Sequence, residues 1–149
     1  MSSILPLGRT MNFTASATTT AKRISVRDCS GIGFLVVNAS GATTLTINEA
    51  NAASGGTSQL LAGGNAVTLT YWTQAATGGV WTAGSGGVNG TSITTVNNAS
   101  ALLYVFVPQG ALSDGFNYLS ASHATGTIIY VQGDLNVMRT PTNLANVTA

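Results

Sequence analysis

The chain has 149 residues, enough for one domain that buries a hydrophobic core without disulfide or metal staples. Only 6% of the residues are charged and the formal net charge is +1, which argues against nucleic acid as a partner because a phosphate-binding face needs clustered Lys and Arg. Only Lys22, Arg23 and Arg27 come near to a cluster, and we expect them on the solvated edge of a strand. The single cysteine, Cys29, excludes an intrachain disulfide and is expected to be a small buried residue.

No segment predicts a membrane span or a secretory signal. No run reaches the roughly 18 apolar residues that a transmembrane helix needs. The first residues, MSSILPLGRTMNF, also lack a basic leader followed by an apolar stretch. We therefore expect no membrane association.

The first half of the chain predicts an arm followed by three strands. Residues 1–20 have no sustained period of either 2 or 3.6, which indicates an extended N-terminal arm. Residues 22–28 alternate between apolar and polar side chains, with Ile24 and Val26 on one face. The run GFLVVN at 33–38 favours a strand that is covered on both faces, and TTLTINE at 43–49 favours a half-exposed strand.

The middle of the chain is less regular. Residues 51–56 predict a loop, and SQLLAG at 58–63 is read as a short strand, with one helical turn as the alternative. In AVTLTYW, Val67, Leu69 and Tyr71 share one face of a predicted strand, and a loop precedes a further strand in VWTAG at 80–84. The Asn89-Gly90 pair is a strong hairpin signal before TSITTV.

Three apolar runs end the predicted domain: ALLYVFVP at 101–108, FNYLSAS at 116–122 and TIIYVQG at 127–133. Turn residues separate them, which is typical of consecutive antiparallel strands, and residues 123–126 are expected to be the loop of a hairpin that pairs the last two. Altogether roughly nine to eleven short strands and no amphipathic helix predict an all-β fold, an antiparallel β-sandwich or jelly-roll-like barrel. We expect this domain at 21–139, with arms at 1–20 and 140–149.

The residue chemistry indicates neither an enzyme nor a cofactor. His123 is the only imidazole, so acid–base chemistry near neutral pH would fall to it, but its predicted place in a hairpin loop favours a structural role. The four acidic residues lie far apart and match no calcium loop or metal-ligand cluster. Trp72 and Trp81, with Tyr71, could form a stacking platform for carbohydrate, although Trp residues in small β domains more often belong to a core or an interface.

Three segments near the C-terminus form a recognisable pattern: SDGFNYL at 113–119, SHATGTII at 122–129 and GDLNVMRTPTNL at 133–144. They resemble small virion proteins of tailed bacteriophages, particularly those infecting actinobacteria, which often end in a similar SDGF…HDL.VQR.P.NL pattern. Residues 24–34 and 46–50 add weaker similarity. The chain departs from the pattern at Gly133, where His would be expected, and at Met138, where Gln would be expected.

The resemblance implies a minor capsid or head-decoration protein without active-site residues. Such a protein would act as a cement on the outer surface of the phage head, after assembly in the cytoplasm of the bacterial host, with the major capsid protein as its partner. We expect a homo-oligomer, with a trimer favoured and a dimer or monomer left open. A tail-tube or tail-fibre component and a carbohydrate-binding β-sandwich module remain the alternatives.

The candidate interface residues lie in the two arms. Pro141 cannot continue a central strand, so the chain should leave the sheet there. Leu144 and Val147 are then available as anchors in a groove of a neighbouring subunit or of the shell, although a frayed tail is the simpler alternative. The full set of predicted capsid or subunit contacts is Leu5, Pro6, Leu7, Arg139, Pro141, Leu144 and Val147.

Overall fold

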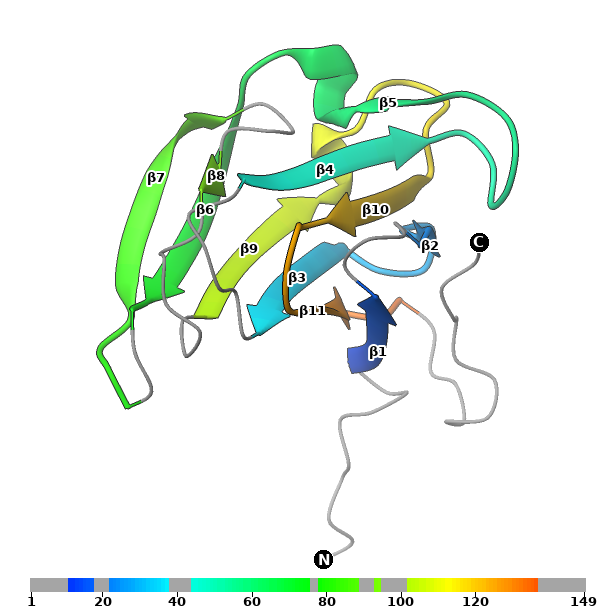
Figure 1. Ribbon diagram of the computed structural model, residues 1–149. Coiled ribbons are helices and arrows are strands. Elements are labelled where there is room, and N and C mark those ends of the chain that lie inside the picture. Colours follow the sequence, from blue (N-terminus) through cyan, green and yellow to red (C-terminus); the bar gives the residue numbers. More distant parts are fainter. Residues whose placement is uncertain are drawn as a thin grey trace, which may run out of the picture.

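The computed structural model is an all-β fold in which two antiparallel sheets pack against each other (Figure 1). It describes residues 11–17, 22–37, 44–75, 78–88, 93–94 and 102–136. These residues form eleven strands and two short 3-10 helices. The predicted fold class and the expected number of strands are therefore confirmed.

The larger sheet has six strands and the smaller one has five. In the larger sheet the order is β1 (Met11–Ala17), β11 (Thr127–Gly133), β3 (Gly31–Val37), β9 (Leu102–Pro108), β6 (Val67–Gln74) and β7 (Thr82–Val88). In the smaller sheet it is β2 (Ile24–Ser25), β10 (Tyr118–Ser122), β4 (Thr44–Ala50) and β5 (Ser58–Leu60), and β8 (Ile93–Thr94) pairs with the first residues of β4. The 3-10 helices are η1 (Leu61–Gly64) and η2 (Gln109–Ala111).

Two predicted strands are shorter in the structure than the sequence pattern indicated. The strand expected at 22–28 is reduced to β2, which pairs only with Tyr118 and Leu119 of β10, although Ile24 and Val26 are buried as expected. The segment 58–63 contains both alternatives, because β5 runs directly into η1. The Asn89-Gly90 hairpin signal lies outside the described residues.

The hairpin predicted between the last two strands is wrong. β10 pairs with β2 and β4, whereas β11 pairs with β1 and β3, so residues 123–126 carry the chain from one sheet to the other. Nor does β9 pair with either, since its neighbours are β3 and β6. The prediction failed because a crossing between sheets and a hairpin use the same turn residues, so the sequence marks the ends of strands but not their partners.

The predicted N-terminal arm, residues 1–20, contains an edge strand. All seven residues of β1 pair with β11, and Asn12 Nδ2 donates a buried hydrogen bond of 2.6 Å to Gln132 Oε1. Periodicity missed this strand because its pattern is inverted: the polar Asn12 points inward, and the apolar Met11 and Phe13 are exposed. The remaining residues of that arm lie outside the described part of the chain.

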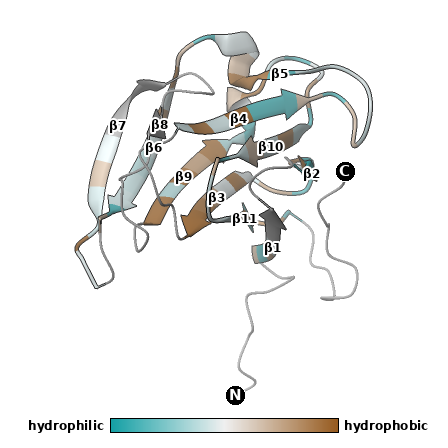
Figure 2. Ribbon diagram, in the orientation of Figure 1, coloured by the Kyte–Doolittle hydropathy of each residue, from teal (hydrophilic) through white to brown (hydrophobic). Residues whose placement is uncertain are grey.

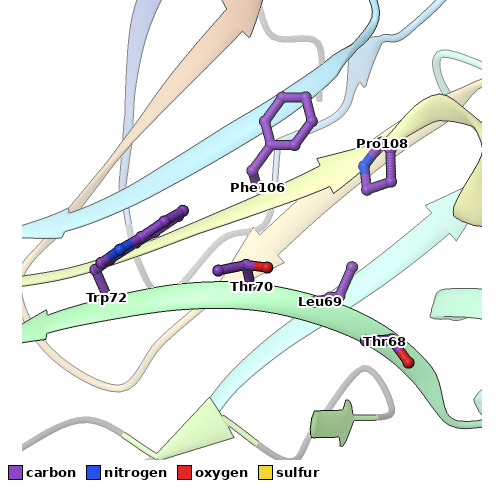
Figure 3. Close-up of a pocket in the computed structure, with 6 residues that line it drawn as sticks. All are labelled: Thr68, Leu69, Thr70, Trp72, Phe106 and Pro108. Atoms are coloured by element: carbon purple, nitrogen blue, oxygen red, sulfur yellow. The ribbon is translucent and has the colours of Figure 1, made fainter. Parts of the chain in front are cut away.

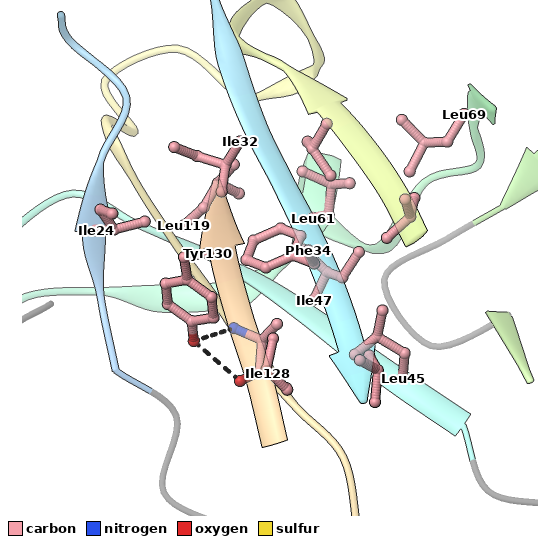
Figure 4. Close-up of a cluster of buried hydrophobic side chains, with 14 of the residues drawn as sticks. Ile24, Ile32, Phe34, Leu45, Ile47, Leu61, Leu69, Leu119, Ile128 and Tyr130 are labelled. Carbon is pink, nitrogen blue, oxygen red and sulfur yellow. Dashed lines mark hydrogen bonds between the residues drawn. The ribbon is translucent and has the colours of Figure 1, made fainter. Parts of the chain in front are cut away.

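The core lies between the two sheets and draws on β2, β3, β4, β6, β9, β10 and β11 (Figure 4). Phe34 and Tyr130 meet edge to face with ring centroids 5.0 Å apart. The Tyr130 hydroxyl accepts a hydrogen bond from Ala121 N–H at 3.0 Å and lies 2.9 Å from the carbonyl oxygen of Lys22. The hydrogen bonds of its hydroxyl group therefore join Tyr130 of the larger sheet to the smaller sheet.

Glu49 of β4 is a carboxylate buried among backbone and amide donors. Its Oε1 accepts hydrogen bonds from Gln59 Nε2 at 2.7 Å and Gly63 N–H at 3.2 Å, and its Oε2 accepts one from Ser113 N–H at 2.9 Å. Burial alone would raise the pKa of this carboxyl, but the hydrogen bonds from Gln59 and Ser113 hold it below its usual value. One side chain thus ties β4 to β5, to η1 and to the segment after η2.

The lowered pKa of Glu49 predicts a loss of stability in acid. The contribution of the carboxylate is complete above its unfolded pKa of roughly 4.3 and is lost as the pH falls through the lower folded pKa. Glu49→Gln should lower the free energy of unfolding by about 1–3 kcal/mol at neutral pH, because its NH₂ group would face another donor. The variant should also show a weaker dependence of stability on pH below about 5.

Urea unfolding of wild type and Glu49→Gln across this pH range measures both effects. Asp114→Asn is the matched control, because Asp114 is an exposed carboxylate in a turn. If Glu49→Gln and Asp114→Asn lost stability equally, the clamping role of Glu49 would be wrong.

Candidate functional site

The outer face of the six-stranded sheet is apolar. Strand register places alternate residues on opposite faces, and the residues between the buried core positions point away from the second sheet. β3 and β9 carry mostly hydrophobic residues (Figure 2). We call the outward set the aromatic face; it comprises Met11, Phe13, Leu35, Trp72, Trp81, Tyr104, Phe106, Ile129 and Val131.

Two glycines of β3 make the centre of the aromatic face flat. A Cβ atom on Gly33 would lie 2.6 Å from the Tyr104 hydroxyl oxygen and 2.7 Å from Cε2 of the same ring, and a Cβ atom on Gly31 would lie 2.7 Å from Cζ of Phe106. The two rings therefore lie across the glycine backbone instead of projecting from the sheet. A flat apolar surface is suited to contact with another protein surface.

Trp72 and Trp81 form a hollow beside this flat centre. Trp72 pairs with Tyr104 across the strands, with ring centroids 5.8 Å apart and an interplanar angle of 38°. Together with Trp81, which is 42% exposed, these side chains line a hollow of about 280 Å³. Burial raises the pKa of the Tyr104 hydroxyl. Because all three lining side chains are aromatic, the hollow is suited to an apolar or planar group.

A second hollow lies between β6 and β9, on the other side of Trp72 (Figure 3). Its volume is about 260 Å³, and its lining residues are Thr68, Leu69, Thr70, Trp72, Phe106 and Pro108. The threonines add hydroxyl groups to an otherwise apolar wall. Both hollows are open on the aromatic face.

No charged residue occurs in any of the six described strands of the larger sheet. The basic trio lies at the other sheet, where Arg23 is more than a solvated edge residue. Its Nη1 donates to the carbonyl oxygens of Ala52 at 2.9 Å and Gly55 at 2.6 Å, which holds the 51–56 loop. Arg27 is exposed. Within its described strands, the larger sheet therefore offers no ion pair to a partner of the aromatic face.

The structure places the other sequence candidates away from this face. His123 is buried at the crossing between the sheets, with Nδ1 2.8 Å from the carbonyl oxygen of Thr125. Tyr71 packs against the core, so it cannot join Trp72 and Trp81 in a platform. Cys29 is buried as predicted, and burial raises the pKa of its thiol to about 11. Among the described residues, no three His, Cys, Asp or Glu side chains come together as metal ligands.

The interface residues predicted from the arms, Leu5, Pro6, Leu7, Arg139, Pro141, Leu144 and Val147, all lie outside the described residues. Sequence reasoning missed Phe13, Tyr104 and Phe106 as surface residues. The signal was present in ALLYVFVP, where both alternating sets are large and apolar, which indicates a strand that is apolar on both faces. No helix in the described ranges has the length and hydropathy to cross a membrane.

No protein-family model, curated protein or solved structure matches the chain.

The contact between Gly33 and Tyr104 predicts a strong energetic coupling. Gly33→Ala should lower the free energy of unfolding by about 1–3 kcal/mol, because the added methyl group displaces the ring. In a Tyr104→Ala background the same substitution should cost almost nothing. A double-mutant cycle from urea unfolding measures the coupling.

Gly110→Ala is the control for this cycle, because a Cβ atom on Gly110 meets nothing within 4 Å. Equal costs of Gly33→Ala in both backgrounds would show that the Tyr104 ring does not lie on the glycine.

Proposed function

We propose that the protein is a structural virion protein, a capsid decoration or cement protein that binds the outer surface of a phage head and stabilises contacts between capsomers. The observation that carries this proposal is the uncharged aromatic face of the six-stranded sheet. Exposed apolar patches of this extent mark interaction surfaces. The resemblance of residues 113–144 to tailed-phage virion proteins is the reason for proposing a phage particle as the assembly.

The composition of the surface supports attachment by apolar and hydrogen-bonded contacts. With only 6% charged residues, the chain has few groups for ion pairs and many Thr, Ser and Asn side chains. The major capsid protein is the proposed partner, the outside of the capsid is the proposed location, and the arms with Leu5, Pro6, Leu7, Arg139, Pro141, Leu144 and Val147 are proposed as further contacts. Because the chain has few charged groups for ion pairs, attachment should depend little on salt concentration.

A carbohydrate-binding module is the second candidate, because Trp72, Trp81 and Tyr104 together line an open hollow. Aromatic rings of this kind stack on sugars, but a sugar also needs hydrogen-bonding groups for its hydroxyls. All three lining residues are aromatic, which favours an apolar side chain of a protein partner over a sugar.

Sedimentation with phage heads tests the proposed function. The full-length protein should sediment with heads that lack it and should remain bound when the NaCl concentration is raised, because few ion pairs are broken. Antibody labelling of virions should mark the head. Labelling confined to the tail, or loss of binding in high salt, would contradict the proposal.

Deletion of residues 140–149 tests the arm. The truncated protein should keep its thermal unfolding temperature, because Leu144 and Val147 are too few apolar residues to stabilise the domain, and it should occupy fewer sites on the heads. The matched control is Leu144→Ser with Val147→Ser in the full-length chain, which keeps the length of the arm and removes its anchors. Full occupancy of the heads by both variants would rule out the arm as a contact.

A further inference from the structure

The aromatic face has a projection at one edge and a hollow towards the other. Phe13 on the edge strand β1 is 51% exposed, and Met11 beside it is 39% exposed. Towards the opposite edge, β6 and β9 enclose the hollow lined by Thr70, Trp72 and Phe106. An exposed apolar projection and an open apolar hollow on one face are complementary in shape and polarity.

Strand register places the projection and the hollow on one line across the sheet. Phe13 pairs with Val131, Val131 pairs with Gly33, and Gly33 pairs with Phe106, which lines the hollow. Two copies of the face related by a two-fold axis parallel to the strands and passing over β11 and β3 would place β1 of each copy opposite β9 and β6 of the other. Each Phe13 ring would then meet the hollow of its partner.

The size of the face suits such a contact. Six strands spaced about 4.8 Å apart and seven residues long, at about 3.3 Å per residue, cover roughly 650 Å² before side-chain relief is counted. A standard interface buries about 800 Å² on each partner. The absence of charged residues in the six described strands also means that two identical faces meet without like-charge repulsion.

We propose that a second copy of this chain covers the aromatic face, with Phe13 of one copy inserted into the hollow between Thr70, Trp72 and Phe106 of the other. The two-fold contact closes as a dimer and fills two hollows at once. The same contact removes Trp72 from water. This inference concerns the protein alone; with a second copy on the aromatic face, the two arms are the proposed contacts that are left for the head.

Sedimentation equilibrium of the full-length protein tests the proposal. The wild type should have twice the 15.0 kDa mass of one chain. Phe13→Asp and Thr70→Arg should each weaken association at least about thirtyfold, the effect of losing an interface hot spot. Both residues are exposed in the single chain, so the substitutions should leave thermal unfolding of the monomer unchanged.

Two further variants make the test specific. Phe13→Asp combined with Thr70→Arg in one chain should restore association, because the new carboxylate of one copy would face the new guanidinium of the next. Ser54→Asp adds the same charge in the exposed 51–56 loop of the other sheet and should leave the mass unchanged.

A monomeric wild type, or single variants that associate as tightly as the wild type, would overturn the proposal. Failure to restore association in the double variant would overturn the specific pairing of Phe13 with the hollow. The result is separable from that of the head-binding assay: a monomer that binds heads contradicts only this inference, and an oligomer that ignores heads contradicts only the decoration function.

Discussion

A sheet that is apolar on both faces needs a cover on each side, and this constraint shapes the whole molecule. The inner face of the six-stranded sheet is covered by the second sheet, with Phe34, Val105 and Tyr130 fully buried between them. The outer face has no such cover within the described residues. Gly31 and Gly33 bring Phe106 and Tyr104 flat against the backbone, which hides part of the apolar area and leaves a smooth surface for a partner.

Polar groups in the interior hold the two sheets in one arrangement. Glu49 of β4 accepts hydrogen bonds from β5, from η1 and from the segment after η2. The Tyr130 hydroxyl connects β11 to β10. Gln132 accepts from Asn12 and donates to the carbonyl oxygen of Ser25, so it links the edge strand β1 to β2. In a chain with so few charges, these buried hydrogen bonds supply the specificity that apolar packing alone lacks.

The sequence predicted the strands well and their partners poorly. Alternation located β4 and β6, and the uniform apolar run at 33–38 located β3. It could not show that Tyr104 and Phe106 are the cover on the outer side, because that contact depends on which strand lies beside β3. The same limit explains the mistaken hairpin around His123 and the missed strand β1, whose polar Asn12 is buried with a hydrogen bond to a residue 120 positions away.

The two tryptophans of the chain both line the aromatic face, so they report directly on whether it is covered. Acrylamide quenching of tryptophan fluorescence across a dilution series of the full-length protein is therefore the most direct measurement. We expect weak quenching and blue-shifted emission at high protein concentration, with stronger quenching and red-shifted emission on dilution as the copies separate. If quenching and emission stayed at the values of exposed indole rings at every concentration, the claim that self-association covers the aromatic face would be contradicted.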